Sequence, residues 1–110
     1  MERPVKGDVI VLPFPYTNLS TTKRRPALVV ANLKGDNVIL AQITTKKRND
    51  PDLIELRKSD FSEGNLEIDS FIMPSILFTA EITTIEYKSG RLKDVKVKEV
   101  ETRLCEIFTR

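Results

Sequence analysis

The sequence predicts a mainly β protein, a small barrel of short strands followed by one C-terminal helix. Short apolar runs rich in Val, Ile and Phe recur along most of the chain, separated by Gly, Pro, Asn and Asp. Runs of this length and composition are typical of strands joined by turns. Near the end, apolar residues change to three- and four-residue spacing with charged residues between them, which is the period of an amphipathic helix. Many short strands with one terminal helix favour a small β-barrel.

The expected strands follow the apolar runs and end at turn residues. They cover 9–12, 26–31, 38–45, 53–56, 69–73 and part of 75–85. Prolines cannot donate to a strand ladder, so we expect the first strand to end at 13–16 and the fifth to stop at Pro74. The other expected features are a helical turn at 59–61, a tight turn at 63–65 and a turn at 87–90. The helix should bury a face made of Val97, Val100, Leu104 and Ile107, widened by Cys105 and Phe108, with Cys105 as an inert core thiol.

The length and composition predict a single globular domain, 1–110. The chain has 110 residues, of which 40% are apolar and 31% charged, the balance of a soluble folded protein rather than a disordered one. No apolar run approaches the roughly 20 residues that span a bilayer, and the N-terminal residues do not read as a signal peptide. The single cysteine permits no internal disulfide, which fits a reducing compartment. We therefore expect a cytoplasmic protein without membrane contact.

Charge is distributed unevenly along the chain. Residues 1–58 carry 11 Lys and Arg against 6 Asp and Glu, a net +5, whereas residues 59–110 carry 7 against 10, a net −3. A basic half of this kind favours a polyanionic partner.

The sequence contains no histidine. This removes the usual acid–base group at neutral pH, the Ser-His and Cys-His nucleophile pairs and the commonest zinc ligand. No P-loop, Rossmann glycine pattern, nucleophile elbow or metal-ligand spacing is present either. Any hydrolytic chemistry must therefore use other groups, and we expect neither a metal nor an organic cofactor.

One predicted hairpin gathers the residues best suited to chemistry. Its strands, 26–31 and 38–45, are joined by the turn 32–37, and antiparallel pairing brings their outer ends together. Arg24 and Arg25 lie at one end, with Thr44 and Thr45 at the other. Because successive strand residues face opposite sides, only one of the two threonines can face Arg25.

A guanidinium at this position would make a good phosphate clamp. Pro26 stiffens the strand entrance behind Arg25, and arginine offers five donors with a permanent charge. Each signal also has an ordinary structural explanation, since arginines form solvated rims, threonine is common in strands and lysine runs are usually solvated loops. We expect the other polar, basic and aromatic groups around this edge to bind substrate: Tyr16, Asn18, Ser20, Lys23, Arg24, Thr45, Lys46, Lys47 and Arg48.

The sequence resembles the MazF/PemK-type toxins of bacterial type II toxin–antitoxin systems. The resemblance spans nearly the whole chain, and the stretches that carry it are Gly7-Asp8-Val9, Arg25-Pro26-Ala27-Leu28-Val29-Val30, Ile43-Thr44, Asp69-Ser70-Phe71-Ile72 and Gly90-Arg91-Leu92. It implies an SH3-like barrel of the MazF/PemK/CcdB kind and a homodimer restrained by a cognate antitoxin. It also implies metal-independent, sequence-selective cleavage of single-stranded RNA such as mRNA. The active arginine and threonine of the family correspond to Arg25 and Thr44. Many members carry a Ser-Glu-Gln-Gly-like stretch before the arginine, where this chain has Asn18 to Lys23.

Two alternatives to an endoribonuclease share the same fold. One is a toxin that binds a protein target such as DNA gyrase, as CcdB-type barrels do, in which Arg25 would be dispensable. The other is a catalytically inactive module that binds RNA or the antitoxin. In the endoribonuclease, the substrate's 2′-hydroxyl would be the nucleophile and the products would be a 2′,3′-cyclic phosphate and a 5′-hydroxyl.

Overall fold

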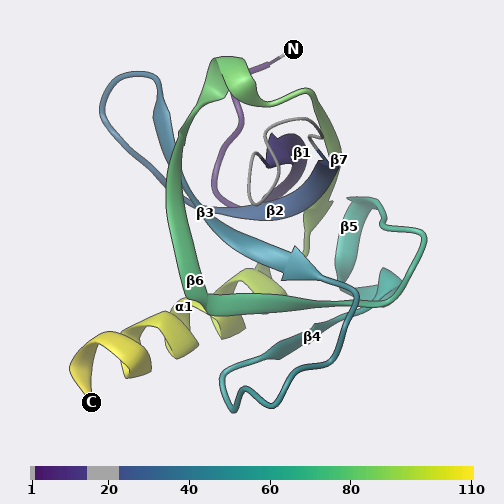
Figure 1. Ribbon diagram of the computed structural model, residues 1–110, viewed down its shortest axis with the longest axis vertical. Helices are drawn as coiled ribbons and strands as arrows, with labels where there is room; N and C mark the ends of the chain where they lie inside the picture. The colour runs from purple at the N-terminus through teal and green to yellow at the C-terminus, as the bar shows by residue number, and fades with distance from the viewer. Residues whose placement is uncertain (1, 15–22) are drawn as a thin grey trace.

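The computed structural model describes residues 2–14 and 23–110, and within them the chain is built mainly from strands (Figure 1). The strands are β1 (Asp8–Phe14), β2 (Lys23–Asn32), β3 (Asn37–Thr44), β4 (Ile54–Leu56), β5 (Phe61–Gly64), β6 (Ser70–Glu81) and β7 (Tyr87–Leu92). The helix α1 (Asp94–Thr109) closes the chain, and the 3-10 turns are η1 (Lys58–Asp60) and η2 (Ile82–Thr84). The predicted mainly β architecture with a C-terminal helix is confirmed, as is the helical turn near residue 59.

The described strands form a seven-stranded sheet in the order β4-β6-β3-β2-β1-β7-β5. Every recorded pairing is antiparallel. β1, β2 and β3 lie next to one another in sequence order, so the predicted hairpin is the centre of the sheet. Figure 1 shows the sheet curling strongly, with β6 running across the molecule and then bending upward along one side.

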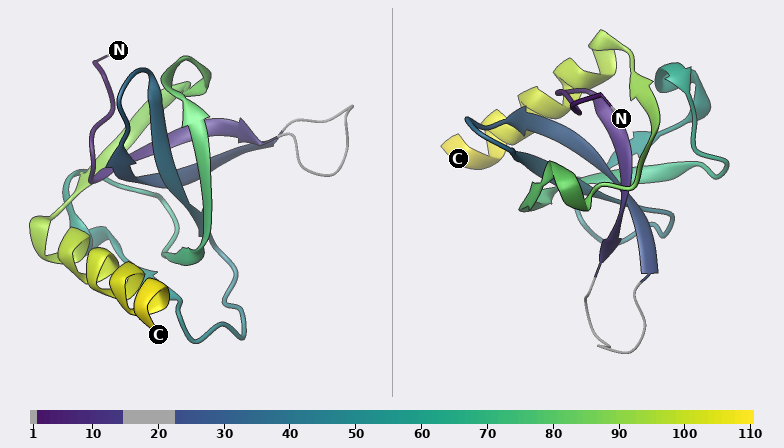
Figure 2. Two further views of the ribbon diagram at one scale, coloured as in Figure 1. Left: turned by 90° about the vertical axis from the view of Figure 1, so that its left-hand side faces the viewer. Right: turned by 90° about the horizontal axis from the view of Figure 1, so that it is seen from above.

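Both faces of this curved sheet are covered, which explains why the strands read as continuous apolar runs. Val9 and Ile10 are neighbours on β1 that point to opposite faces, and neither is exposed to solvent. Ile10 belongs to a cluster with Val29 and Leu40 inside the curl. Val9 belongs to a second cluster, which includes Val100 of α1, and Figure 2 shows the helix lying along one side of the strands.

The prolines end the strands less sharply than the sequence predicts. β1 continues through Pro13 to Phe14, and β6 runs through Pro74 as one long strand. Pro13 pairs only with Arg24 of β2, because the recorded β1–β7 pairs stop at Val11. At Pro74, the β3–β6 register steps from Leu77 directly to Met73. Proline is tolerated at such a bulge or beside an unpaired edge because no ladder hydrogen bond is required there.

Two expected turns are strands instead. Residues 63–65 were expected to form a tight turn and 87–90 another, but Gly64 ends β5 and Gly90 lies within β7. A Cβ atom on Gly64 would lie 2.2 Å from the Ser89 carbonyl oxygen, and one on Gly90 would lie 2.6 Å from that of Glu63. These glycines therefore permit close approach of two strand backbones, a use that sequence pattern alone does not distinguish from a turn.

The helix buries part of the predicted apolar face, and the buried part is narrower than the sequence predicts. Val100 is fully buried, and Val97 and Leu104 pack against the same cluster. Cys105 is exposed and Phe108 is 69% exposed, so the prediction that these two residues widen the buried face is wrong. One stripe of the helix packs against the cluster that contains Val9, Leu28 and Ile43, and the residues beside this stripe remain outside it. No described helix is long and apolar enough to cross a membrane.

Candidate functional site

Strand register places Arg25 and Thr44 on the same face of the sheet. β1 and β2 pair Leu12 with Arg25, and β2 and β3 pair Ala27 with Gln42. Arg25 and Thr44 each lie two residues beyond this last recorded β2–β3 pair, and no pairing is recorded between them. Residues two apart on a strand share a face, so Thr44, rather than Thr45, is on the same face as Arg25.

The two neighbouring arginines have different electrostatic surroundings. The Arg24 Nε–H donates to both carboxylate oxygens of Glu86, at 2.7 and 2.5 Å. This hydrogen bond, assisted by the attraction of the two charges, raises the pKa of Arg24 above its ordinary value. The Arg25 side chain is only partly exposed and has no recorded hydrogen bond or ion pair with another residue in the described ranges 2–14 and 23–110.

Thr44 is buried, and its hydroxyl group is held in a fixed environment. Its Oγ1 accepts the backbone N–H of Lys46 at 3.2 Å. A hydroxyl that already accepts can still donate its proton, so Thr44 can offer one directed hydrogen bond to an anion. Thr45 is exposed and lines a small cavity of about 170 Å³ together with Pro26, Leu66, Glu67, Ile68 and Ser70.

Further cations lie near Arg25 and Thr44 in the sequence. Lys23 begins β2, while Lys46, Lys47 and Arg48 follow β3, and all four side chains are exposed. None of the four has an ion pair with a described residue. Three of the residues expected to bind substrate lie outside the described residues: Tyr16, Asn18 and Ser20.

Three further side chains lie at this end of the sheet: Glu86, Gln42 and Phe14. Glu86 neutralises Arg24 from a distant part of the chain, and no local signal reveals that contact. Gln42 is buried two residues before Thr44, and its signal was a polar side chain inside an apolar run. Phe14 at the end of β1 belongs to the core, because it is buried and its ring packs edge-on against Phe78 with the centroids 5.1 Å apart.

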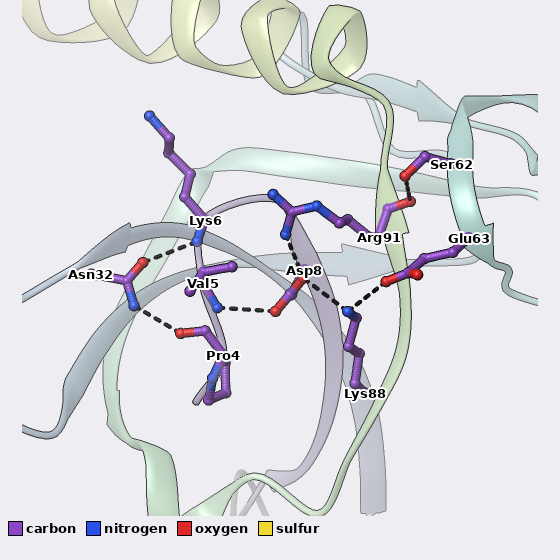
Figure 3. A network of polar contacts seen from close by, with 9 residues as sticks. All are labelled: Pro4, Val5, Lys6, Asp8, Asn32, Ser62, Glu63, Lys88 and Arg91. Carbon is purple, nitrogen blue, oxygen red and sulfur yellow. Dashed lines mark hydrogen bonds and ion pairs between the residues drawn. The ribbon is translucent and has the colours of Figure 1, made fainter. Parts of the chain in front are cut away.

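A second charged cluster lies at the opposite end of β1 (Figure 3). The Asp8 carboxylate is buried and accepts hydrogen bonds from Arg91 at 2.8 Å and the Val5 backbone N–H at 3.0 Å. Lys88 lies 3.5 Å from the same carboxylate and 2.6 Å from Glu63. The hydrogen bond with Glu63 raises the pKa of Lys88 above its ordinary value. Every charge in this cluster has a partner.

The Arg25 end of the sheet therefore has cations that are unpaired within the described part of the chain, together with a hydroxyl donor, and groups of these kinds are able to bind phosphate. Among the described residues, no group of three or more Cys, Asp or Glu side chains is arranged to hold a metal ion.

The sequence matches a family model described as the PemK-like, MazF-like toxin of type II toxin–antitoxin systems, over residues 5–108. The chain belongs to this family. No curated protein sequence matches the chain. The resemblance carried by the Gly-Asp and Arg-Pro stretches is thereby confirmed.

Solved structures of MazF proteins share the fold at low sequence identity. An endoribonuclease from a mycobacterial species, in complex with its cognate antitoxin, is 17% identical with a TM-score of 0.76, over 96% of this chain and 94% of that one. MazF from Deinococcus radiodurans is 16% identical with a TM-score of 0.76, over 100% of both chains. The MazE–MazF structure from the same organism is 18% identical with a TM-score of 0.76, over 96% of both chains. The fold of this toxin is accordingly a MazF-like antiparallel half-barrel with a C-terminal helix.

Proposed function

We propose that this MazF-like toxin is a metal-independent endoribonuclease that cleaves single-stranded RNA. The observation that supports this most directly is the Arg25 side chain, which has no recorded partner among the described residues and is on the same sheet face as the buried Thr44. The similarity of the fold to that of endoribonucleases supports the same reaction class.

RNA supplies its own nucleophile, so the chemistry requires little from the protein. The 2′-hydroxyl oxygen attacks the adjacent phosphorus while the bond from phosphorus to the 5′-oxygen breaks. The hydroxyl proton leaves to a base, the 5′-oxygen takes up a proton, and the products are a 2′,3′-cyclic phosphate and a 5′-hydroxyl. The protein must place the phosphate and stabilise the charge that develops on its oxygens.

Arg25 and Thr44 have complementary roles in this step. A guanidinium keeps its protons at any working pH, so Arg25 acts as a donor to the phosphate oxygens rather than as the base. Thr44 donates its hydroxyl proton to a phosphate oxygen and fixes its position, because its own oxygen is held by the Lys46 N–H. Lys46, Lys47 and Arg48 hold the flanking phosphates, with Lys23 on the β2 side.

Sequence selectivity would come from contacts to the bases. The cavity beside Thr45 is lined by Pro26 and Leu66, among others, and its walls are mainly apolar. An apolar slot suits the flat face of an unstacked base. Tyr16, Asn18 and Ser20 are proposed to contact other bases or phosphates.

The expected partners of the family are proposals for this chain. We infer a homodimer and a cognate antitoxin that covers the basic end of the sheet and competes with RNA. Relatives crystallised with antitoxins support the second inference.

The deciding experiment incubates purified protein with a long RNA in the presence of EDTA and maps the ends of the fragments. We expect cuts at a short recurring sequence, with 2′,3′-cyclic phosphate and 5′-hydroxyl ends, and no cleavage of the same sequence as DNA. Cleavage of DNA, or ends with a 5′-phosphate, would contradict the proposal.

If the protein leaves RNA intact, a binding assay separates the two remaining alternatives. Retention of DNA gyrase by the immobilised toxin would indicate a protein-binding toxin of this fold. Retention of RNA without cleavage would indicate an inactive binding module.

A further inference from the structure

The basic loop that follows β3 is attached at both of its ends. At its start, the Lys46 N–H is bound by Thr44 Oγ1. At its end, Asp50 Oδ1 accepts the Asp52 N–H at 2.9 Å, and the Asp50 carbonyl oxygen accepts the Leu53 N–H at 3.3 Å. This is an Asx turn, in which a side chain organises its own following backbone. The three cations lie between these two attachments.

The second attachment is held from outside the loop. Ser75 of β6 donates its hydroxyl to Asp50 Oδ2 at 3.1 Å. The Asp52 carboxylate is buried and receives both terminal nitrogens of Arg110, at 3.3 and 2.9 Å. Arg103 of α1 also reaches the Pro51 carbonyl oxygen, at 3.5 Å. We call the set formed by Asp50, Asp52, Ser75, Arg103 and Arg110 the loop clamp.

The carboxylates of the loop clamp do not neutralise the cations of the loop, because they pair with other groups. A buried carboxylate is costly unless it is paired, and Asp52 satisfies this need with Arg110 rather than with the adjacent lysines. The hydrogen bond with Asp52 raises the pKa of Arg110. The fork geometry of arginine also fixes the direction of the contact. Lys46, Lys47 and Arg48 consequently remain exposed and unpaired.

We infer that the C-terminal helix positions the basic loop for RNA binding through the pair of Arg110 and Asp52. This inference rests on the proposed function for its RNA ligand, but not for the position of the loop. Arg110 and Asp52 are positioning residues, because they touch the loop and not the substrate. The loop is connected to the catalytic pair through Thr44, so its position determines where the flanking phosphates lie relative to Arg25.

Limited proteolysis with trypsin tests the position of the loop without any RNA. Trypsin cleaves after Lys46, Lys47 and Arg48 only when this stretch opens, and nicking then follows the population of the open form. We expect Arg110→Ala to raise the rate of nicking at these three sites by about three- to tenfold, the effect of losing one well-aligned, partly exposed arginine fork. Arg110→Lys keeps the positive charge but loses the forked guanidinium, so its rate of nicking should lie between those of the unchanged protein and Arg110→Ala.

The matched control is Lys6→Ala. It removes an ion pair of similar length, 2.7 Å between Lys6 Nζ and Glu101 of the same helix, and it should leave nicking in the loop unchanged. The double variant Asp52→Asn with Arg110→Ala should nick no faster than Arg110→Ala alone, because both changes break one contact. Equal nicking of Arg110→Ala and the unchanged protein, or an equal rise in Lys6→Ala, would overturn the inference.

RNA kinetics supply the second readout. Arg110→Ala should raise KM for RNA while kcat stays within about twofold, because binding and not transition-state stabilisation is lost. The rise in KM should be smaller than the rise in nicking, because KM follows the fraction of closed loop whereas nicking follows the fraction of open loop. A fall in kcat with unchanged KM and unchanged nicking would overturn the inference. If the unchanged protein does not cleave RNA, the proposed function fails, and the nicking comparison still decides whether the helix holds the loop.

Discussion

The two ends of β1 both carry clusters of charge, but they differ in how the charges are used. At the Asp8 end, one buried carboxylate joins Arg91 and Lys88, and Lys88 in turn reaches Glu63. At the other end, Arg25 and Lys47 have no recorded partner. One cluster is satisfied within the fold, whereas the other is open to an external anion.

This difference shows that pairing, rather than basic composition, distinguishes a structural charge from one available for binding. The neighbours Arg24 and Arg25 show the same contrast within two residues. They point to opposite faces of β2, and only Arg24 finds a carboxylate, that of Glu86. The contrast between these regions can be tested by changing one partner at a time.

The largest effect is expected at Arg25. Arg25→Ala should lower kcat for RNA cleavage by about 10²–10³-fold, the usual consequence of deleting one donor to a developing oxyanion. Arg24→Ala is the matched control. Its effect should be confined to a few-fold change in KM, because Arg24 already forms an ion pair with Glu86. Single-turnover cleavage with saturating protein measures the chemical step. Equal losses in the two variants would remove the distinction between the arginines.

The next effect concerns the stability of the opposite end. Asp8→Asn should lower the free energy of unfolding by about 2 kcal/mol, because charge-assisted hydrogen bonds to a buried carboxylate are lost. Urea unfolding followed by circular dichroism measures this change. The cleavage rate of the folded fraction should stay the same, and a loss of activity as large as that of Arg25→Ala would contradict a purely structural role for this cluster.

The sequence was sufficient for the centre of the sheet and insufficient for its edges. The apolar runs around Val29 and Leu40 identify their strands because both faces are covered. The predicted strand end at Pro74 and the predicted turn at Gly64 were wrong, because each residue is compatible with several local structures. The structure at Pro74 depends on a bulge, and that at Gly64 depends on a neighbouring backbone. The predicted burial of Cys105 was wrong, because helical spacing alone does not show how wide a face of the helix is buried.

The candidate site divides in a similar way. The convergence of Arg25 and Thr44 is predicted from antiparallel pairing, and it stays a prediction because the recorded β2–β3 pairs end at Ala27 and Gln42. The resemblance to the family, rather than residue chemistry, selected Arg25 over Arg24. The physical distinction between them depends on Glu86, a contact between residues 62 positions apart in sequence. Contacts at such separation leave no local pattern, and the clamp between Asp52 and Arg110 was missed for the same reason.

A smaller effect is expected for the loop cations. Lys47→Gln should weaken RNA binding modestly and make the slope of log affinity against log salt concentration shallower by about 0.7, the value for one phosphate contact to a single strand. Fluorescence anisotropy over a series of salt concentrations, with Arg25→Ala as background to prevent cleavage, measures the slope. Lys88→Gln is the control, because Lys88 is already paired with Glu63, and it should leave the slope unchanged.

The smallest effect, and the sharpest test of the contrast, comes from releasing a paired charge. Glu86→Gln removes the carboxylate that holds Arg24, while the Glu86 backbone N–H can still donate to the Val11 carbonyl oxygen. If pairing decides which cations bind RNA, this variant should bind more tightly than the unchanged toxin and its salt slope should steepen by up to about 0.7. Glu101→Gln is the matched control, because it frees Lys6 at the end of β1 away from Arg25. Tighter binding in both variants would mean that net charge alone sets affinity, whereas a gain only in Glu86→Gln would show that Arg24 is a phosphate contact held in reserve by its ion pair.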